Sequence, residues 1–215
     1  MIKLQVALDL LHINRALQIA ELSAKAGADI IEAGTPLIKY NGIKAVKVLK
    51  AKIRDKEIMA DMKIMDVGAI EAEMAFNAGA DIVSVMALAS AETIEEAIAT
   101  ARGKNKKVLV DLMNVEDYEK KISEIARLNP DIICFHVGVD VQKRRKTGVE
   151  ALANELEKYV SEYSFEFAVA GGINELTAPI FAKAGADIII VGGAITKSDD
   201  PYRATLKIKE ALKLF

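Results

Sequence analysis

The sequence predicts an α/β protein with a single (β/α)8 barrel, a TIM barrel, over residues 1–215. Short apolar runs alternate with amphipathic stretches along the whole chain, eight of each. Dividing 215 residues by eight leaves about 27 per pair, the size of a small strand-and-helix unit. A repeated sequence motif, Ala-Gly-Ala-Asp before an apolar run, supports the count of eight units. No linker, low-complexity tract or composition break divides the chain.

The short apolar runs are the expected strands, and the amphipathic stretches between them are the expected helices. The strands are expected at residues 4–8, 29–33, 57–62, 81–86, 108–112, 131–137, 167–170 and 187–191. The helices are expected at residues 13–25, 43–53, 69–77, 93–101, 118–128, 149–160, 176–183 and 202–212. Strands that alternate with helices in this way favour a parallel sheet.

The repeated motif places an aspartate at the start of every second expected strand. These residues are Asp29, Asp81, Asp131 and Asp187, which are 52, 50 and 56 residues apart. At three of them a glycine that can close the preceding helix stands two residues earlier. An open doubly wound sheet could carry such a repeat, but eight regular units favour the closed barrel. Because catalytic groups of such barrels lie at the strand ends, we expect these four aspartates to serve stability.

Composition narrows the classes of function. Lys and Arg number 29 against 31 Asp and Glu, so no global charge favours nucleic acid or a membrane surface. No uncharged apolar run approaches the roughly 18 residues of a membrane span. The N-terminal residues lack the pattern of a signal peptide, and the lone Cys134 fits a reducing compartment. The sequence therefore predicts a cytoplasmic protein that acts on small molecules.

Charged residues recur at the carboxyl ends of the expected strands. Alternation along a strand places Asp61 and Lys63 on one face, directed into the barrel, and Asp66 follows three residues later. The same rule directs four further polar side chains inward, namely Asp9, Glu32, Asp111 and His136. Any one of them has a structural alternative, for example Asp9 or Asp111 as a helix cap or His136 as a core histidine. Five strands that deliver charge to one rim predict an active site.

Two glycine pairs and one basic run complete the candidate features. Gly171-Gly172 follows the seventh expected strand and Gly192-Gly193 the eighth, where barrels of this class commonly bind phosphate through backbone N–H groups. Either pair alone could be a tight turn. The run at residues 143–146, Lys-Arg-Arg-Lys, is interpreted as a solvated face, with attraction of an anionic substrate as the alternative.

The motif Asp61-Met62-Lys63-Ile64-Met65-Asp66 resembles the Asp-x-Lys-x-x-Asp signature of the orotidine monophosphate decarboxylase superfamily. Within it, the chain most resembles the 3-hexulose-6-phosphate synthases. The resemblance extends from end to end through Val6-Ala7-Leu8-Asp9, Glu32-Ala33-Gly34-Thr35-Pro36-Leu37-Ile38-Lys39, Glu71-Ala72-Glu73-Met74-Ala75-Phe76, His136-Val137-Gly138-Val139-Asp140-Val141-Gln142, Ala170-Gly171-Gly172-Ile173 and Val191-Gly192-Gly193-Ala194-Ile195.

The resemblance implies a TIM barrel of the ribulose-phosphate-binding type and a role for each candidate residue. Glu32 and Asp61 would bind Mg2+, with Mn2+ as an alternative. Lys63 would add positive charge, held by Asp61 and Asp66, and His136 would transfer the proton. Asp9 and Asp111 would orient substrate hydroxyls, and the four glycines, Gly171, Gly172, Gly192 and Gly193, would bind the phosphate.

The implied reaction is the aldol condensation of ribulose 5-phosphate with formaldehyde, or its reverse, in a homodimer in which Asp66 reaches the partner's site. The related 3-keto-L-gulonate 6-phosphate decarboxylases are the alternative. Those enzymes typically carry arginines where Val139 and Gly193 stand, and both departures favour the synthase. A catalytically idle sugar-phosphate-binding barrel also remains open. A phosphosugar epimerase is disfavoured, because His12 and His136 are the only histidines for a metal site.

Overall fold

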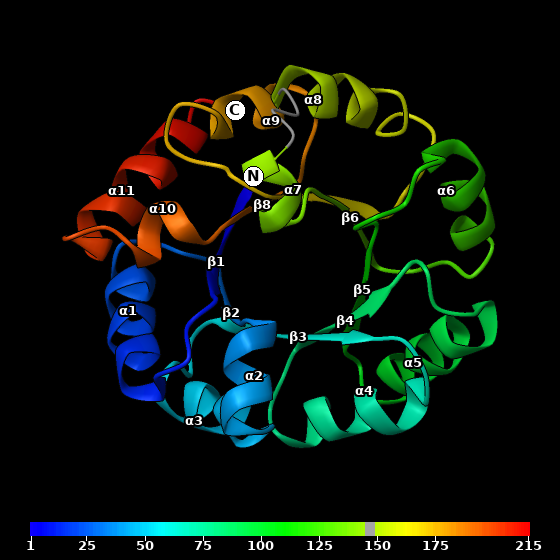
Figure 1. Ribbon diagram of the computed structural model, residues 1–215, viewed down its shortest axis with the longest axis horizontal. Coiled ribbons are helices and arrows are strands. Elements are labelled where there is room, and N and C mark those ends of the chain that lie inside the picture. Colours follow the sequence, from blue (N-terminus) through cyan, green and yellow to red (C-terminus); the bar gives the residue numbers. More distant parts are fainter. Residues whose placement is uncertain (145–148) are drawn as a thin grey trace.

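The computed structural model describes residues 1–144 and 149–215, in which eight parallel strands close into a barrel ringed by helices (Figure 1). The strands pair in sequence order, and β1 closes the barrel against β8. They are β1 (Lys3–Leu8), β2 (Ile30–Ala33), β3 (Glu57–Ile64), β4 (Ile82–Met86), β5 (Lys107–Asp111), β6 (Ile132–His136), β7 (Glu166–Ala170) and β8 (Ile188–Val191). The prediction of a (β/α)8 barrel is confirmed.

Eight helices of the described residues lie where the amphipathic stretches predict them. They are α1 (Ile13–Lys25), α3 (Lys44–Lys52), α4 (Gly68–Asn77), α5 (Ala91–Gly103), α6 (Tyr118–Ala126), α8 (Val149–Glu157), α9 (Ala178–Lys183) and α11 (Pro201–Leu212). Within residues 1–144 and 149–215, every helix is too short or too polar to span a lipid bilayer.

Three further helices were not predicted. They are α2 (Thr35–Asn41), α7 (Val139–Arg144) and α10 (Gly193–Thr196), which follow β2, β6 and β8. They have seven, six and four residues, and no amphipathic stretch was recognised at these positions in the sequence. All three begin within three residues of a strand's carboxyl end, which places them at the rim where the candidate site residues lie.

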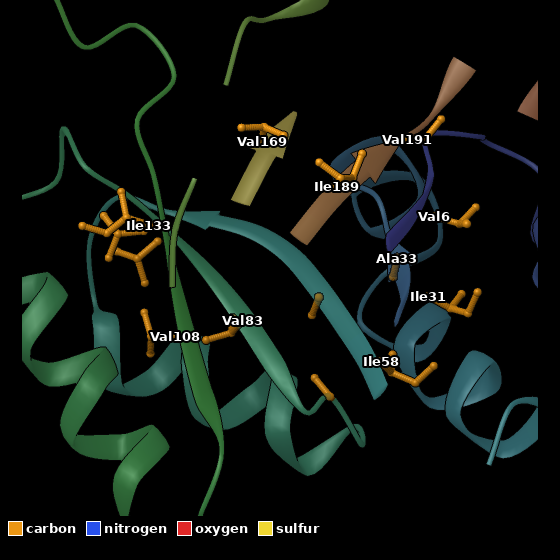
Figure 2. Close-up of a cluster of buried hydrophobic side chains, with 14 of the residues drawn as sticks. Val6, Ile31, Ala33, Ile58, Val83, Val108, Ile133, Val169, Ile189 and Val191 are labelled. Carbon is orange, nitrogen blue, oxygen red and sulfur yellow. The ribbon is translucent and has the colours of Figure 1, made fainter. Parts of the chain in front are cut away.

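Strand alternation divides the apolar residues into two cores. Side chains on the outer face of the sheet pack against the helices, and every strand contributes at least one of those labelled in Figure 2. They are Val6, Ile31, Ala33, Ile58, Val83, Val108, Ile133, Val169, Ile189 and Val191. The inner core is smaller and fills the barrel with Ala7, Ile30, Met59, Ile82, Leu109, Ile132, Cys134, Ala168, Ala170, Ile188 and Ile190. Burial of these residues fixes which polar side chains share the inner face.

The four repeated aspartates lie at the amino ends of the strands, as expected. Each carboxylate accepts a hydrogen bond from a backbone N–H at the start of the preceding strand, at 2.7 to 2.9 Å. The pairs are Asp29 with Leu4, Asp81 with Ile58, Asp131 with Val108 and Asp187 with Phe167. The repeat therefore has a structural explanation, because each copy joins two neighbouring strands.

We expect Asp81→Ala to lower the free energy of unfolding by about 1–3 kcal/mol, because three donors lose their acceptor. Asp81 accepts hydrogen bonds from Lys50, Lys106 and the N–H of Ile58. Burial acts to raise the pKa of Asp81, but these bonds outweigh it and lower the pKa below its usual value. The ionic part of the stabilisation is therefore complete at neutral pH and is lost as the pH falls through that lowered pKa.

Urea unfolding at pH 7 and in acid would measure the difference between the wild type and this variant. Asp55→Ala is the matched control, because Asp55 is an exposed carboxylate in the turn before β3. An equal loss of stability in both variants would contradict the prediction.

Candidate active site

A cavity of about 630 Å³ opens at the carboxyl ends of the strands. All but one of the predicted site residues line it, namely Asp9, Glu32, Asp61, Lys63, Asp111, His136, Gly171, Gly172, Gly192 and Gly193. Its apolar floor includes Ala7, Met59, Leu109 and Cys134, which belong to the inner core. The cavity therefore gathers polar side chains that are distant in sequence above the packed interior of the barrel.

Lys63 reaches the cavity from an irregular part of β3. The strand changes register against β4 between Ala60 and Ile64, and Lys63 adopts a φ of 50° in the left-handed region. Its backbone N–H donates to Ser84 Oγ at 2.9 Å. Non-glycine residues in such conformations cost about 1–3 kcal/mol and concentrate at functional sites. Alternation thus predicted the direction of Lys63 correctly, although the backbone is not that of a regular strand.

The ammonium group of Lys63 lies between two carboxylates. Its Nζ is 3.1 Å from Asp61 Oδ1 and 2.8 Å from Asp111 Oδ2. Burial acts to lower the pKa of Lys63, but the charges of Asp61 and Asp111 outweigh it and hold the pKa above its usual value. The lysine is therefore charged at neutral pH. Within one chain, Asp61 and Asp111 are the carboxylates that hold the lysine, and Asp111 was not expected in this role. The expectation that Asp66 also holds it stays a prediction.

Asp111 also binds His136. The Nδ1 of His136 is 2.8 Å from Asp111 Oδ2, and the N–H of Met113 donates to Oδ1 at 2.9 Å. Burial acts to raise the pKa of Asp111, but His136 and Lys63 outweigh it and lower the pKa to about 2. Because an ionised carboxylate only accepts hydrogen bonds, Nδ1–H of His136 is the donor, and Nε2 is the ring nitrogen left to exchange a proton with a substrate. Asp111 thus orients both the lysine and the histidine.

Three carboxylates, Asp9, Glu32 and Asp61, share the other side of the cavity. Burial and the negative charges of Asp61 and Asp9 raise the pKa of Glu32, and burial and Asp61 raise the pKa of Asp9. Gln5 Nε2 donates to Glu32 at 2.6 Å, and Thr35 Oγ1 donates to Asp61 at 2.6 Å. Mutual repulsion of buried carboxylates is relieved when a cation binds, and hard oxygen donors suit Mg2+.

The cavity offers few side chains that could coordinate a metal ion without help from substrate or water. Among residues 1–144 and 149–215, no three Asp, Glu, His or Cys side chains are grouped closely enough to hold an ion. Mg2+ commonly binds through one or two carboxylates and completes its shell with substrate oxygens and water. Glu32 and Asp61 fit that pattern.

Thr35 and Ser84 are two residues of the site that the sequence pattern did not predict. Both hydroxyl groups donate to the carboxylate of Asp61, Ser84 to Oδ1 at 2.8 Å. Ser84 had a signal in the sequence, because alternation along the expected strand 81–86 directs this polar residue inward. Thr35 had none, because it lies in the unpredicted helix α2.

The glycine pairs form the side of the cavity next to β7 and β8. Gly171 has a φ of 112°, and a Cβ there would lie 2.4 Å from the carbonyl oxygen of Val137. The three atoms nearest to a Cβ at Gly193 all belong to the side chain of Lys197, at 3.8 to 3.9 Å. Gly171 is therefore required by the backbone, whereas Gly193 leaves open space toward the cavity.

Asp66 is the one predicted site residue that this cavity does not include. Its carboxylate is exposed and accepts a hydrogen bond from the N–H of Val67 at 2.8 Å. The role of Asp66 across a dimer interface stays a prediction. The interpretation of the basic run 143–146 also stays untested, because Arg145 and Lys146 lie outside the described residues.

Charged side chains that converge at the carboxyl ends of a closed parallel barrel define this chain as a TIM-barrel enzyme. The family model for the orotidine 5'-phosphate decarboxylase / HUMPS family matches residues 2–208. The chain belongs to this family.

Individual members of the family are similar to this chain over nearly its full length. A 3-hexulose-6-phosphate synthase from Mycobacterium gastri is 40% identical over 98% of this chain and 99% of its own length. The crystal structure of a 3-hexulose-6-phosphate synthase, also 40% identical, has a TM-score of 0.93 over 98% of this chain and 100% of that one. A crystal structure of KGPDC from Streptococcus mutans has a TM-score of 0.92 at 26% identity, over 99% of this chain and 98% of that one.

We expect Gly34→Ala to destabilise the fold by roughly 1–3 kcal/mol, because a side chain does not fit at this position. A Cβ on Gly34 would lie 2.2 Å from Asp9 Oδ1 and 2.9 Å from the carbonyl oxygen of Leu8. The variant would therefore displace a carboxylate of the cavity together with the end of β1.

Gly103→Ala is the matched control, because a Cβ there meets no atom within 4 Å. Gly103 ends α5, where alanine is the better helix former, so this variant should keep or slightly raise the stability. Urea unfolding of both variants makes the comparison. A wild-type stability for Gly34→Ala would show that β1 and α2 can separate at no cost.

Proposed function

We propose that this chain is a lyase that condenses D-ribulose 5-phosphate with formaldehyde to D-arabino-3-hexulose 6-phosphate, and catalyses the reverse cleavage. The observation that carries the proposal is the network in which Asp111 holds both Lys63 and His136 at one cavity. It places a charged ammonium and a basic imidazole nitrogen beside each other, as proton removal next to a carbonyl requires. The end-to-end similarity to 3-hexulose-6-phosphate synthases supports the same reaction.

The new carbon–carbon bond determines which proton must be removed. The ketone of the product is the former C2 carbonyl of ribulose 5-phosphate, so formaldehyde is added at C1. His136 Nε2 accepts the proton from C1, and the electron pair moves onto the carbonyl oxygen as an enediolate forms. C1 then attacks the carbon of formaldehyde, and the resulting alkoxide takes a proton back from His136. Cleavage follows the same steps in reverse.

The other charged residues stabilise and hold the reacting atoms. Lys63 places its positive charge beside the enediolate oxygens, and Asp111 keeps the imidazole ring in the orientation that presents Nε2. Asp9 orients substrate hydroxyls. The earlier expectation of the same role for Asp111 stays untested, although its contacts with Lys63 and His136 support a positioning role. The backbone at Gly171, Gly172, Gly192 and Gly193 binds the phosphate.

Glu32 and Asp61 are the residues that would hold Mg2+, or Mn2+ in its place. Their shared cavity and the raised pKa of Glu32 support this assignment. The ion supplies positive charge that favours ionisation of the substrate beside its carbonyl. Thr35 and Ser84 keep the carboxylate of Asp61 in place through its two oxygens.

The alternative is decarboxylation of 3-keto-L-gulonate 6-phosphate, which reaches the same type of enediolate by loss of CO2. The structural similarity of this chain to KGPDC, a 3-keto-L-gulonate 6-phosphate decarboxylase, supports this alternative. The cavity is lined by Val139 and Gly193, where the decarboxylases typically carry arginine, and this favours the synthase. An idle sugar-phosphate-binding barrel is a further alternative.

An assay with ribulose 5-phosphate, formaldehyde and Mg2+ tests the proposal, with and without a chelator. Chelator-sensitive consumption of formaldehyde supports the synthase and its metal. Release of CO2 from 3-keto-L-gulonate 6-phosphate alone would assign the chain to the decarboxylases. Binding of sugar phosphate with neither reaction would identify an idle barrel.

We expect Lys63→Ala and Asp61→Ala each to lower the rate of formaldehyde consumption by at least about a hundredfold, because each removes a charge beside the developing enediolate. Lys44→Ala and Asp55→Ala are matched controls, because both residues are exposed and neither lines the cavity. Circular dichroism would verify that all four variants are folded. Near-normal activity of either cavity variant would overturn the site assignment.

We further propose a homodimer in which Asp66 acts in the partner's site, and a cytoplasmic location. Four large apolar side chains are exposed beside Asp66, namely Met65, Val67, Ile70 and Met74. Exposed apolar side chains gathered at one place indicate an interaction surface. The single buried thiol of Cys134 supports the location, because it forms no disulfide.

A mixture of two inactive variants tests the shared site. Lys63→Ala lacks the catalytic lysine, and Asp66→Ala lacks the residue proposed to act across the interface. In a mixed dimer one of the two sites has both residues intact, so random mixing should restore about a quarter of the wild-type activity. No recovery after subunit exchange, verified by mass spectrometry, would place Asp66 in its own chain's site or outside catalysis.

A further inference from the structure

Lys197 is a charged residue of the cavity that the reaction described above does not use. It caps the carboxyl end of α10, where its N–H donates to the carbonyl oxygen of Gly193 at 3.1 Å. Its side chain folds back over that glycine. The Cδ, Cε and Nζ atoms all lie within 3.8 to 3.9 Å of the position that a Cβ on Gly193 would occupy.

In the described part of the chain, the other cationic side chains of the cavity are paired with carboxylates, whereas Lys197 is not. Lys63 is bound between Asp61 and Asp111, and His136 is bound to Asp111. Within residues 1–144 and 149–215, Lys197 takes part in no hydrogen bond or ion pair of its side chain, although it lines the same cavity. An anion that enters the cavity beside β8 therefore meets one ammonium group whose charge is not already balanced.

Asp9 places a negative charge at this end of the cavity. Its Oδ2 lies 3.6 Å from the position of a Cβ on Gly192, so a carboxylate approaches the glycine pair from the barrel interior. A phosphate dianion bound at the backbone of Gly192 and Gly193 would be repelled from that side. Lys197 lies on the other glycine of the pair, at the exposed rim.

We propose that Lys197 binds the phosphate group of the sugar phosphate, with its ammonium folded over Gly193. This assignment rests on the proposed function for the identity of the sugar phosphate. The missing side chain at position 193 provides the space through which Lys197 reaches the cavity. The residue is thus a determinant of affinity for the phosphate, separate from the groups that carry out the reaction.

Calorimetric titration with ribulose 5-phosphate tests the assignment without requiring turnover. We expect Lys197→Met to raise the Kd about tenfold, since a hydrogen bond to a charged group is lost. Lys197→Arg should remain close to the wild type, because it keeps the charge. Lys207→Met is the matched control: this exposed lysine lies on the neighbouring helix α11, where it pairs with Glu175 outside the cavity.

Two further measurements separate phosphate binding from a general effect. In turnover, Lys197→Met should raise KM while kcat stays within about twofold, as expected for binding energy present in both ground and transition states. D-ribulose, which lacks the phosphate, should bind equally to the wild type and the variant. Added salt should reduce the difference for ribulose 5-phosphate, because the contact is exposed.

An unchanged Kd for ribulose 5-phosphate in Lys197→Met would overturn the assignment, as would an equal loss of affinity for D-ribulose. If the wild type binds ribulose 5-phosphate but consumes no formaldehyde, the proposed reaction fails while the Lys197 comparison still decides the phosphate contact. Absence of any binding by the wild type would overturn both.

Discussion

The carboxylate of Asp111 is the interaction on which the cavity depends. It is almost completely buried, at 2% exposure, and binds the side chains of Lys63 and His136. A buried carboxylate is costly unless it is paired and hydrogen-bonded, and here both side chains and the N–H of Met113 satisfy it. The contacts of Lys63 with Asp61 and Asp111 together keep the lysine charged within the barrel.

The two ends of the barrel use aspartate in opposite ways. At the amino ends of the strands, the repeated aspartates accept backbone N–H groups, and Asp29 and Asp81 also bind lysines. The lysines balance the negative charge of Asp29 and Asp81, and all four aspartates join neighbouring strands. At the carboxyl ends, Asp9 and Glu32 have raised pKa values because burial and other carboxylates outweigh the cations nearby. The carboxyl ends of the strands, where negative charge is in excess, are therefore suited to bind a cation and a polar substrate.

The strands position the charged side chains of the cavity, and the short helices at the rim add further contacts around them. Thr35 at the start of α2 fixes Asp61, and Gln142 in α7 packs against Gly171 and Gly172. Lys197 at the end of α10 lies over Gly193. The loops and short helices of a barrel thus adjust binding on a scaffold that the strands keep rigid.

The sequence by itself determined the barrel and the inward set of side chains. Eight apolar runs with period-two alternation specify both, because burial of one strand face forces Asp9, Glu32, Asp61, Asp111 and His136 onto the other. Only the tertiary structure decided which of them touch. Lys63 and Asp111 are 48 residues apart, and their 2.8 Å contact depends on the closure and register of the barrel. The irregular backbone of Lys63 and the reach of Lys197 across Gly193 likewise arise from contacts between elements, which alternation within one strand does not encode.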